Sequence, residues 1–565
     1  MSGVRIEYGG VAVGANEHFA PAVTESADIS TVKDLTIDDV SFKNYGNPCE
    51  LYSVLLDGNT TSIPNDADSG IGWWSEQISG ADGRFSEPIT LTLTASSNFT
   101  SSGITLVFDT FTNTFANDIA VKWYDGDNLL FEKDYTPDSA FYFCSDKVES
   151  YNRVVIDFKS INMPYNRLKL KSVEYGMKIT FKGDELRNCS ITQELDPISS
   201  QISINTCNFT LDSKRDIDFA FQERQPVSVY FNDALRSTSF IKSFTRKSKT
   251  VWDIKAEDYI GILENVAFVG GIYTRASAGD LLDDIFTTAK APYTVTDSLK
   301  NAMVTGYIPY TNCRDALMQV AFAIGAVVDT SDSDKVNISK ISGEISQNIP
   351  LDRILQGQSF AENAKVTAVE VTSHTYSKSD EVYTAYTAED TDIGKTVLVR
   401  FTEPLWGLDI INGTKIRSGE NYALIEVYGG CELTGKKYVH NMSVHRHEYE
   451  GVTYDVAENV ISVTDATLVN PSNASAVLDR CAGYYKSQNI VNLKIVEGKH
   501  RIRYGEAVYG QTVYGKVTDD KAAKVGERIS CDTEYLGNIK GIILRQSFNL
   551  NGGIIIKDTK MKQGG

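Results

Sequence analysis

The chain is poor in the residues that build metal and redox sites. Its 565 residues include only 6 histidines, 7 methionines and 8 cysteines. The cysteines form no Cys-X-X-Cys pair, which excludes the common structural-zinc and thioredoxin-type patterns. We therefore expect reduced, buried thiols in a protein made in a cytoplasm. They are Cys49, Cys144, Cys189, Cys207, Cys313, Cys431, Cys481 and Cys531.

Long apolar runs and an excess of positive charge are also absent. No stretch is long enough to cross a bilayer, and the first residues lack the basic and apolar regions of a signal peptide, so we expect no membrane anchor. The net charge is −19 and the pI about 4.9. This balance excludes nucleic-acid binding through a general basic surface, and we expect no sequence-specific nucleic-acid partner.

One dense basic cluster interrupts this acidic balance. We interpret it as a solvated hairpin, with a contact to DNA or to an acidic partner as the alternative. Its members are Lys242, Arg246, Lys247 and Lys249.

Catalytic motifs are absent as well. The sequence contains no Gly-X-Ser-X-Gly, His-Glu-X-X-His, Walker or dinucleotide-binding pattern. Carboxylate pairs such as Asp283-Asp284 have no base or nucleophile beside them. We expect no catalytic residue and no cofactor. Glycosidases can lack local motifs, so a polysaccharide- or peptidoglycan-degrading enzyme stays open as an alternative.

What is present indicates a protein of about three or four domains that is mainly β. The chain has 29 tyrosines, 24 phenylalanines and 42 glycines, and short alternating strands recur along it. Ala120–Tyr124 is one such strand, and Asp125-Gly126 predicts a hairpin turn after it. Val121 and Trp123 share a face of this strand, which predicts that Trp123 points into a core.

The stretch 269–340 predicts a small α/β unit. Ser277 and Asp280 form a capping box ahead of an apolar helical face, and Asn312 is a good N-cap for a second helix. Gly325 ends that second helix, and strands at Val327-Val328 and 336–339 follow. Farther on, an apolar face at helical spacing predicts a helix from Asn470 to Gln488.

The run 306–338, GYIPYTNCRDALMQVAFAIGAVVDTSDSDKVNI, resembles the middle of baseplate-hub or tail-associated proteins from tailed phages and prophages of Gram-positive bacteria. The run 525–553, VGERISCDTEYLGNIKGIILRQSFNLNGG, resembles the end of such proteins. The resemblance implies a multidomain, mainly β chain with two hub β-barrels and a small α/β insertion. The implied segments are 1–34, a β-sandwich at 35–176, barrels at 177–268 and 345–469, the α/β domain at 269–344, and a helix with a C-terminal β-meander at 470–565.

The sandwich carries a second resemblance. Residues 55–58, LLDG, and 72–85, GWWSEQISGADGRF, resemble the start of discoidin or galactose-binding-like domains, which often bind glycans through loops at one end. The segments 59–72 and 96–103 are rich in small polar residues suited to such loops. Candidate sugar-stacking residues are Trp73, Trp74, Trp123 and Tyr124, with a role in the core as the alternative for each aromatic ring.

A metal-site candidate lies in HNMSVHRHEYE. His445 and His447 are two apart and share one face if the segment is a strand, and His440 could join them if folded alongside. The alternative is a solvated polar strand face.

The hub resemblance implies a structural, non-enzymatic virion protein at the tail tip, made in the bacterial host cytoplasm. It implies a homotrimer that closes the tail tube as a ring. Its partners would be distal-tail or tail-tube proteins, the tape-measure protein, receptor-binding or spike proteins, and host surface glycans. A carbohydrate-binding adhesin is a further alternative.

Overall fold

The computed structural model describes most of the chain, and its residues form two compact units. One unit comprises Glu7–Thr180 and Asp218–Pro226, and the other comprises Met1–Ile6, Phe181–Ile217 and Val227–Gly565. The described residues are 3–11, 15–25, 73–101, 103–109, 113–212, 226–232, 234–450, 458–497, 500–501, 511–512, 523–550 and 555–564. The predicted fold class, multidomain and mainly β, is confirmed. No helix among these residues is long and apolar enough to cross a membrane.

The unit Glu7–Thr180 is a β-sandwich around one core. Its five-stranded sheet has the order β2-β4-β9-β6-β7 and its four-stranded sheet the order β3-β10-β5-β8. Phe108 of one sheet meets Phe158 of the other edge-on, with ring centroids 6.3 Å apart. The strands are β2 (Ala20–Val23), β3 (Trp73–Ile78), β4 (Arg84–Ser101), β5 (Ile104–Phe108), β6 (Ala116–Asp125), β7 (Asn128–Tyr135), β8 (Phe141–Cys144), β9 (Val148–Ile161) and β10 (Arg167–Glu174).

Local sequence explains much of this sandwich. Val121 and Trp123 on β6 are fully buried, as their alternation predicts, and Gly126 makes the turn into β7 with a positive φ of 58°. Strand β2 pairs with β4, and Phe19, just before β2, lies in the core of the sandwich. Strand β4 continues to Ser101, so the loop expected at 96–103 is largely strand, because these residues pair with β9 across two bulges. The segments 55–58 and 59–72 lie outside the described residues.

The α/β part confirms the two predicted helices and the N-caps at Ser277 and Asn312. Helix α3 (Ala278–Ala289) begins after Ser277, whose hydroxyl accepts from the Gly279 N–H, and α5 (Cys313–Ile324) begins after Asn312. Gly325 ends α5 with a φ of 72°. Its other elements are α2 (Tyr259–Glu264), α4 (Asp297–Lys300), β17 (Ala267–Phe268), β18 (Gly271–Ser277), β19 (Tyr293–Val295), β20 (Met303–Ile308), β21 (Thr311–Asn312), β22 (Val327–Asp329) and β23 (Val336–Ser339).

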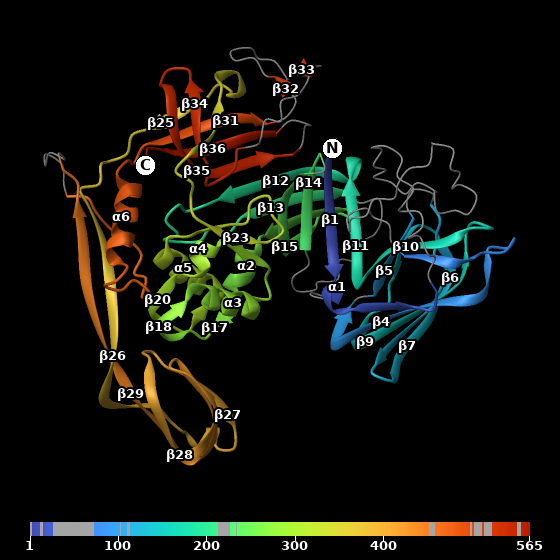
Figure 1. The fold of residues 1–565 in the computed structure, drawn as a ribbon, viewed down its shortest axis with the longest axis horizontal. Helices are drawn as coiled ribbons and strands as arrows, with labels where there is room; N and C mark the ends of the chain where they lie inside the picture. The colour runs from blue at the N-terminus through green and yellow to red at the C-terminus, as the bar shows by residue number, and fades with distance from the viewer. Residues whose placement is uncertain are drawn as a thin grey trace. The chain divides into compact units, whose positions relative to one another are not determined.

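A 13-stranded sheet joins segments that are far apart in the sequence. Its main path is β11-β1-β14-β15-β16-β13-β12-β35-β36-β31-β25, and β34 pairs with both β35 and β24. Strand β12 pairs with β35, which connects residues before the α/β part to the C-terminal strands (Figure 1). The strands are β1 (Val4–Val11), β11 (Gly176–Lys182), β12 (Leu186–Glu194), β13 (Thr206–Asp212), β14 (Pro226–Phe231), β15 (Ala234–Arg246), β16 (Val251–Glu257), β24 (Ile345–Ile349), β25 (Ser359–Ala361), β31 (Ile490–Glu497), β34 (Arg528–Thr533), β35 (Gly537–Asn549) and β36 (Ile555–Gln563).

A long two-stranded arm completes the larger unit, which comprises Met1–Ile6, Phe181–Ile217 and Val227–Gly565. Strands β26 (Ala368–Thr387) and β29 (Tyr422–Glu448) pair along most of their length, and Figure 1 shows them extending from beside α6 (Ala474–Tyr485) to β27 and β28. The far end, with β27 (Thr396–Arg400) and β28 (Leu405–Ser418), has its own small core. The near end packs against α6, and the short strand β30 (Val460–Ser462) pairs with β26.

Candidate functional site

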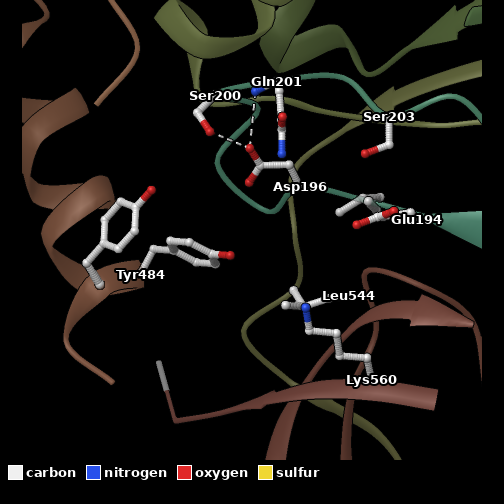
Figure 2. Close-up of a pocket in the computed structure, with 10 residues that line it drawn as sticks. Glu194, Asp196, Ser200, Gln201, Ser203, Tyr484, Leu544 and Lys560 are labelled. Carbon is white, nitrogen blue, oxygen red and sulfur yellow. Dashed lines mark hydrogen bonds between the residues drawn. The ribbon is translucent and has the colours of Figure 1, made fainter. Parts of the chain in front are cut away.

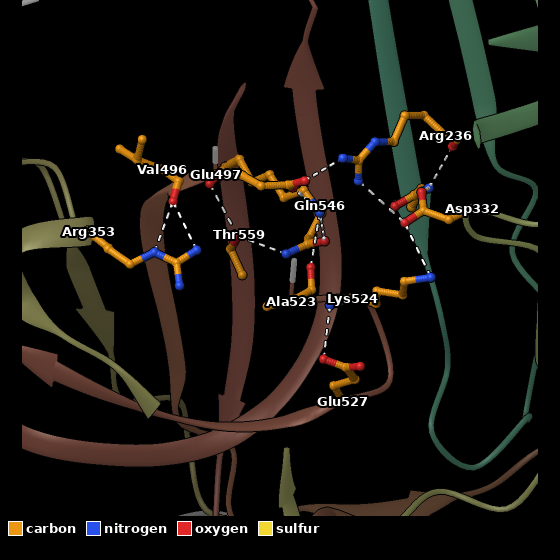
Figure 3. Close-up of polar contacts among 12 residues, drawn as sticks. Arg236, Asp332, Arg353, Val496, Glu497, Ala523, Lys524, Glu527, Gln546 and Thr559 are labelled. Carbon is orange, nitrogen blue, oxygen red and sulfur yellow. Dashed lines mark hydrogen bonds and ion pairs between the residues drawn. The ribbon is translucent and has the colours of Figure 1, made fainter. Parts of the chain in front are cut away.

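A buried polar cluster joins β15 to the C-terminal strands (Figure 3). Arg236 Nη2 on β15 lies 2.6 Å from Glu497 Oε1 on β31, and Lys557 Nζ on β36 lies 3.0 Å from Glu497 Oε2. The Lys557 side chain is 2 % exposed and that of Glu497 8 %. Burial alone would raise the pKa of Glu497, but the charges of Lys557 and Arg236 hold it below its usual value.

Hydrogen bonds extend this charged cluster on one side, and an ion pair extends it on the other. Lys557 Nζ also donates to the Ala523 carbonyl at 3.0 Å and to Gln546 Oε1 at 3.3 Å. On the other side, Arg236 Nη1 lies 3.7 Å from Asp332 Oδ2, in the turn between β22 and β23. One cluster therefore connects β15, the α/β part, β31 and β36. We assign this cluster a structural role, because each of its charges is already paired with another charge of the chain.

A pocket of about 200 Å³ lies where the loop after β12 faces α6 and β36 (Figure 2). Asp196 in this loop accepts hydrogen bonds from Ser200 Oγ at 2.6 Å and from the Gln201 N–H at 3.2 Å, so its carboxylate shapes the loop. The pocket is lined by Glu194, Leu195, Asp196, Ser200, Gln201, Ser203, Tyr484, Tyr485, Leu544 and Lys560.

Two tyrosines and a carboxylate are the groups that recognise a cation or a sugar, but here the chain supplies the cation itself. Lys562 Nζ lies 3.6 Å from the centroid of the Tyr484 ring and 5.2 Å from that of Tyr485. Lys562 is 4 % exposed, and burial lowers its pKa to about 8. The rings of Tyr484 and Tyr485 are thus already in contact with a lysine of the chain, and this contact attaches α6 to β36.

Another buried acid has a structural role. Asp258 caps α2, accepting from the Ile260 N–H at 3.1 Å and from Thr330 Oγ1 at 2.5 Å. Burial raises its pKa to about 7. Its carboxyl interacts with Thr330 and with backbone groups of Asn205, Ile260 and Gly261, so it holds the start of α2 in place.

The four aromatic residues predicted as sugar ligands lie in two different sheets of the sandwich. Trp73 and Trp74 are on β3, whereas Trp123 and Tyr124 are on β6. Trp123 is fully buried, and Trp74 is 4 % exposed with Lys169 Nζ 4.7 Å from its ring. Trp73 is half-buried and its Nε1–H donates to the Glu25 carbonyl. The ring of Tyr124 carries the Arg153 guanidinium 4.5 Å away.

The three histidines predicted as metal ligands are all on β29 but have different partners. His440 meets His374 of β26, with Nε2 2.9 Å from Nδ1. His445 bonds to Ser373 Oγ, and His447 packs on the edge of Tyr449. Among the described residues, no group of three or more His, Cys, Asp or Glu side chains is placed to hold a metal ion.

The sequence predicted the buried thiols, but it predicted neither the contact of His374 with His440 nor the charged cluster. Seven of the eight cysteines are confirmed as free and buried, and Cys49 lies outside the described residues. For Lys557 a signal existed: it occupies an inward position of β36, in step with the buried Ile555 and Met561. The basic cluster at 242–249 forms the exposed hairpin between β15 and β16, as predicted.

Comparisons with known proteins place the chain beside tail proteins at low similarity. No family model matches it, and no curated protein matches it. A tail protein from Neisseria meningitidis MC58 is 10% identical with a TM-score of 0.41, over 69% of this chain and 94% of that one. The 43 kDa tail protein of prophage MuSo2 from Shewanella oneidensis is 7% identical with a TM-score of 0.40, over 68% and 94%. Prophage tail protein gp18 from Listeria monocytogenes EGD-e is 11% identical with a TM-score of 0.38, over 69% and 91%. Solved tail and prophage tail proteins are thus among the structures that this chain partly resembles.

Proposed function

We propose that this chain is a structural hub protein at the distal tip or baseplate of a phage tail or tail-like particle. In this role it closes the tail tube as a ring, as a homotrimer, and anchors the components that attach to the host. The proposal starts from the resemblance of the runs 306–338 and 525–553 to hub proteins. It makes the chain a virion component with tail-tube, distal-tail, tape-measure and receptor-binding proteins as neighbours.

The observation that carries the proposal is the continuous 13-stranded sheet. It joins β12–β16, which precede the α/β part in the sequence, to β31 and β34–β36, which follow it. The Arg236–Glu497–Lys557 cluster connects β15 to β31 and β36 of the same sheet. Such a construction suits a part that bears load, because separating its two halves requires breaking the whole β12–β35 strand pairing. An open sheet also ends in strands whose backbone groups can pair with a further copy.

The test is the place and copy number of the chain in a particle. We expect purified tails to contain three copies at the tip in a cryo-electron reconstruction, and the isolated full chain to form trimers by light scattering. A chain that is absent from purified tails, or that is a monomer both alone and in the particle, would refute the proposal.

The sandwich unit is proposed to contribute to host attachment or to dock a receptor-binding protein. It has a core of its own, which is what an added module requires. Tails whose hub lacks 15–174, which removes the sandwich but spares β1 and β11 of the 13-stranded sheet, are expected to assemble but to adsorb less to host cells. Failure to assemble would instead favour a spacer role, and unchanged adsorption would remove the attachment role.

The chain is also proposed to have no hydrolytic activity. The intact chain is expected to release neither reducing sugar nor soluble peptide from host cell walls. Turnover that a single Asp or Glu substitution abolishes would overturn this and favour the enzyme alternative.

A further inference from the structure

A second pocket, of about 260 Å³, lies on the outward face of the C-terminal part of the 13-stranded sheet. Strands β31, β36 and β35 are neighbours there, with β36 in the middle (Figure 1). Outward side chains of these three strands line most of the pocket, and Gly357, ahead of β25, lines it as well. The outward residues are Asn492, Lys494, Arg545, Ser547, Asp558 and Lys560.

Strand register gathers three positive charges in this pocket. Asp558 on β36 lies opposite Lys494 on β31 and opposite Ser547 on β35. Two positions farther along β36, Lys560 lies opposite Arg545 on β35. Directly opposite residues have Cβ atoms about 5 Å apart, and like charges in such a pair destabilise a sheet. The pairing of Lys560 with Arg545 therefore costs stability unless a negative charge lies between them.

The chain supplies no such negative charge to the three cations. No carboxylate of the described residues lies within 4.0 Å of the charged nitrogens of Lys494, Arg545 or Lys560. Asp558 is the one acidic residue that lines the pocket, so the cations exceed the carboxylates there. Glu194 on β12 lies opposite Arg545 in the register, but the two side chains form no ion pair.

The exposed hairpin between β15 and β16 shows the opposite arrangement. Lys242 Nζ lies 2.5 Å from Glu257 Oε1, and Lys247 is paired with Asp253. The chain has 74 acidic residues and only 55 lysines and arginines, so carboxylates are plentiful. Three neighbouring cations without a carboxylate partner are therefore a local excess of positive charge, which attracts an anion.

The arrangement of the donors favours a tetrahedral anion. The cations of Lys494, Arg545 and Lys560 come from three neighbouring strands, so each can contact a different oxygen of a phosphate, whereas a carboxylate offers two oxygens in one plane. The planar guanidinium of Arg545 also suits a bidentate contact with phosphate. The hydroxyls of Ser547 and Thr192 lie 3.1 Å apart and share one hydrogen bond, which leaves one hydroxyl hydrogen to donate to a bound oxygen.

We propose that this pocket is a phosphate-binding site, in which Lys494, Arg545 and Lys560 hold the phosphate group of a free phosphate, a monoester or a phosphodiester. A bound phosphate relieves the repulsion between Lys560 and Arg545. Asp558 weakens binding, because its charge opposes that of the ligand. The proposal does not depend on the role of the chain in a tail, because all of these residues belong to one unit.

Trace reductive methylation of the full chain, read by mass spectrometry, tests the site. Inorganic phosphate should slow the labelling of Lys494 and Lys560 about threefold or more, with a midpoint on the order of 1 mM, because the ion is small and water screens the cations. Lys540, an exposed lysine elsewhere on β35, should be labelled at an unchanged rate. Sodium acetate at the same ionic strength should protect neither Lys494 nor Lys560.

Two further ligands distinguish the possible sources of the phosphate group. Protection by glycerol phosphate alone would assign the site to free phosphate and monoesters. Protection by dimethyl phosphate as well would extend it to phosphodiesters.

Substitutions in the pocket give the second readout, which is the phosphate concentration that half-protects Lys494. Arg545→Gln, at an exposed position, should raise this concentration about tenfold, because a charge-assisted contact is lost. Asp558→Asn should lower it about threefold, since it removes the opposing charge. The matched control Lys540→Gln should leave it unchanged. Equal protection by acetate, equal protection of Lys540, or unchanged binding in Arg545→Gln would overturn the proposal, and so would weaker binding in Asp558→Asn.

Discussion

Removing the carboxylate of Glu497 should destabilise the large unit more than almost any exposed change. In Glu497→Gln the shape is kept, but Arg236 and Lys557 lose the charge between them, and their side chains are only 12 % and 2 % exposed. Arg236 keeps its ion pair with Asp332, but the buried Lys557 loses its carboxylate partner, and breaking a buried pair by removing one partner costs about 3–5 kcal/mol. Because the chain has two units and can unfold in steps, the measurement should be local. We expect exchange of the β31 and β36 amides to accelerate about a hundredfold to a few thousandfold.

Two comparison variants make this prediction specific. Lys560→Met removes an exposed charge on the same strand and should change local stability by only about 0.5 kcal/mol or less. The triple change Arg236→Met, Glu497→Leu and Lys557→Met replaces the three central charges with apolar groups and leaves Asp332 paired with Lys524. It should recover most of the loss, since pairing and desolvation nearly cancel. A Glu497→Gln protein as protected as the wild type, or a triple variant worse than the single one, would refute the reasoning.

The remaining predictions concern single positions. Trp123→Ala should cost the sandwich about 3–5 kcal/mol, seen as a lower denaturant midpoint of that unit, because the ring is fully buried; a loss under about 1 kcal/mol would contradict its core role. Asp258, whose pKa is raised to about 7, should make the wild type less stable as the pH rises from about 4 to 7, and Asp258→Asn should lack this dependence in pH-resolved melting curves. Gly306→Ala should destabilise the α/β part, because at φ 147° the added Cβ would lie 2.4 Å from the Thr467 carbonyl oxygen; an unchanged melting temperature would show that the backbone moves away. Asn312→Ala should lower the stability of α5 by about 1 kcal/mol, measured by exchange of its first amides, since the bond to the Asp315 N–H is lost, and Asn312→Ser should restore most of it.

Local sequence by itself determined the helix ends and turns, because the side chains and φ angles that set them lie within a few residues of each other. The cap at Ser277, the stop at Gly325 and the turn at Gly126 depend on side chains or φ values that neighbouring residues set, so each could be predicted from its own segment. The burial of Trp123 followed from strand alternation alone. These signals predicted the mainly β class and the helices, and the division into six segments remains a prediction.

Only the tertiary structure decided which of these elements meet. Arg236 and Glu497 are 261 positions apart, and His374 and His440 are 66 apart, so no local pattern pairs them. The sequence grouped His440 with His445 and His447 because they are close along the chain, but a cross-strand register brings His374 to it instead. Strand pairing is set by the fit of whole faces and by closure of long loops, and both are properties of the folded chain. The charged cluster and the His374–His440 contact are therefore consequences of β12 pairing with β35 and of β26 pairing with β29.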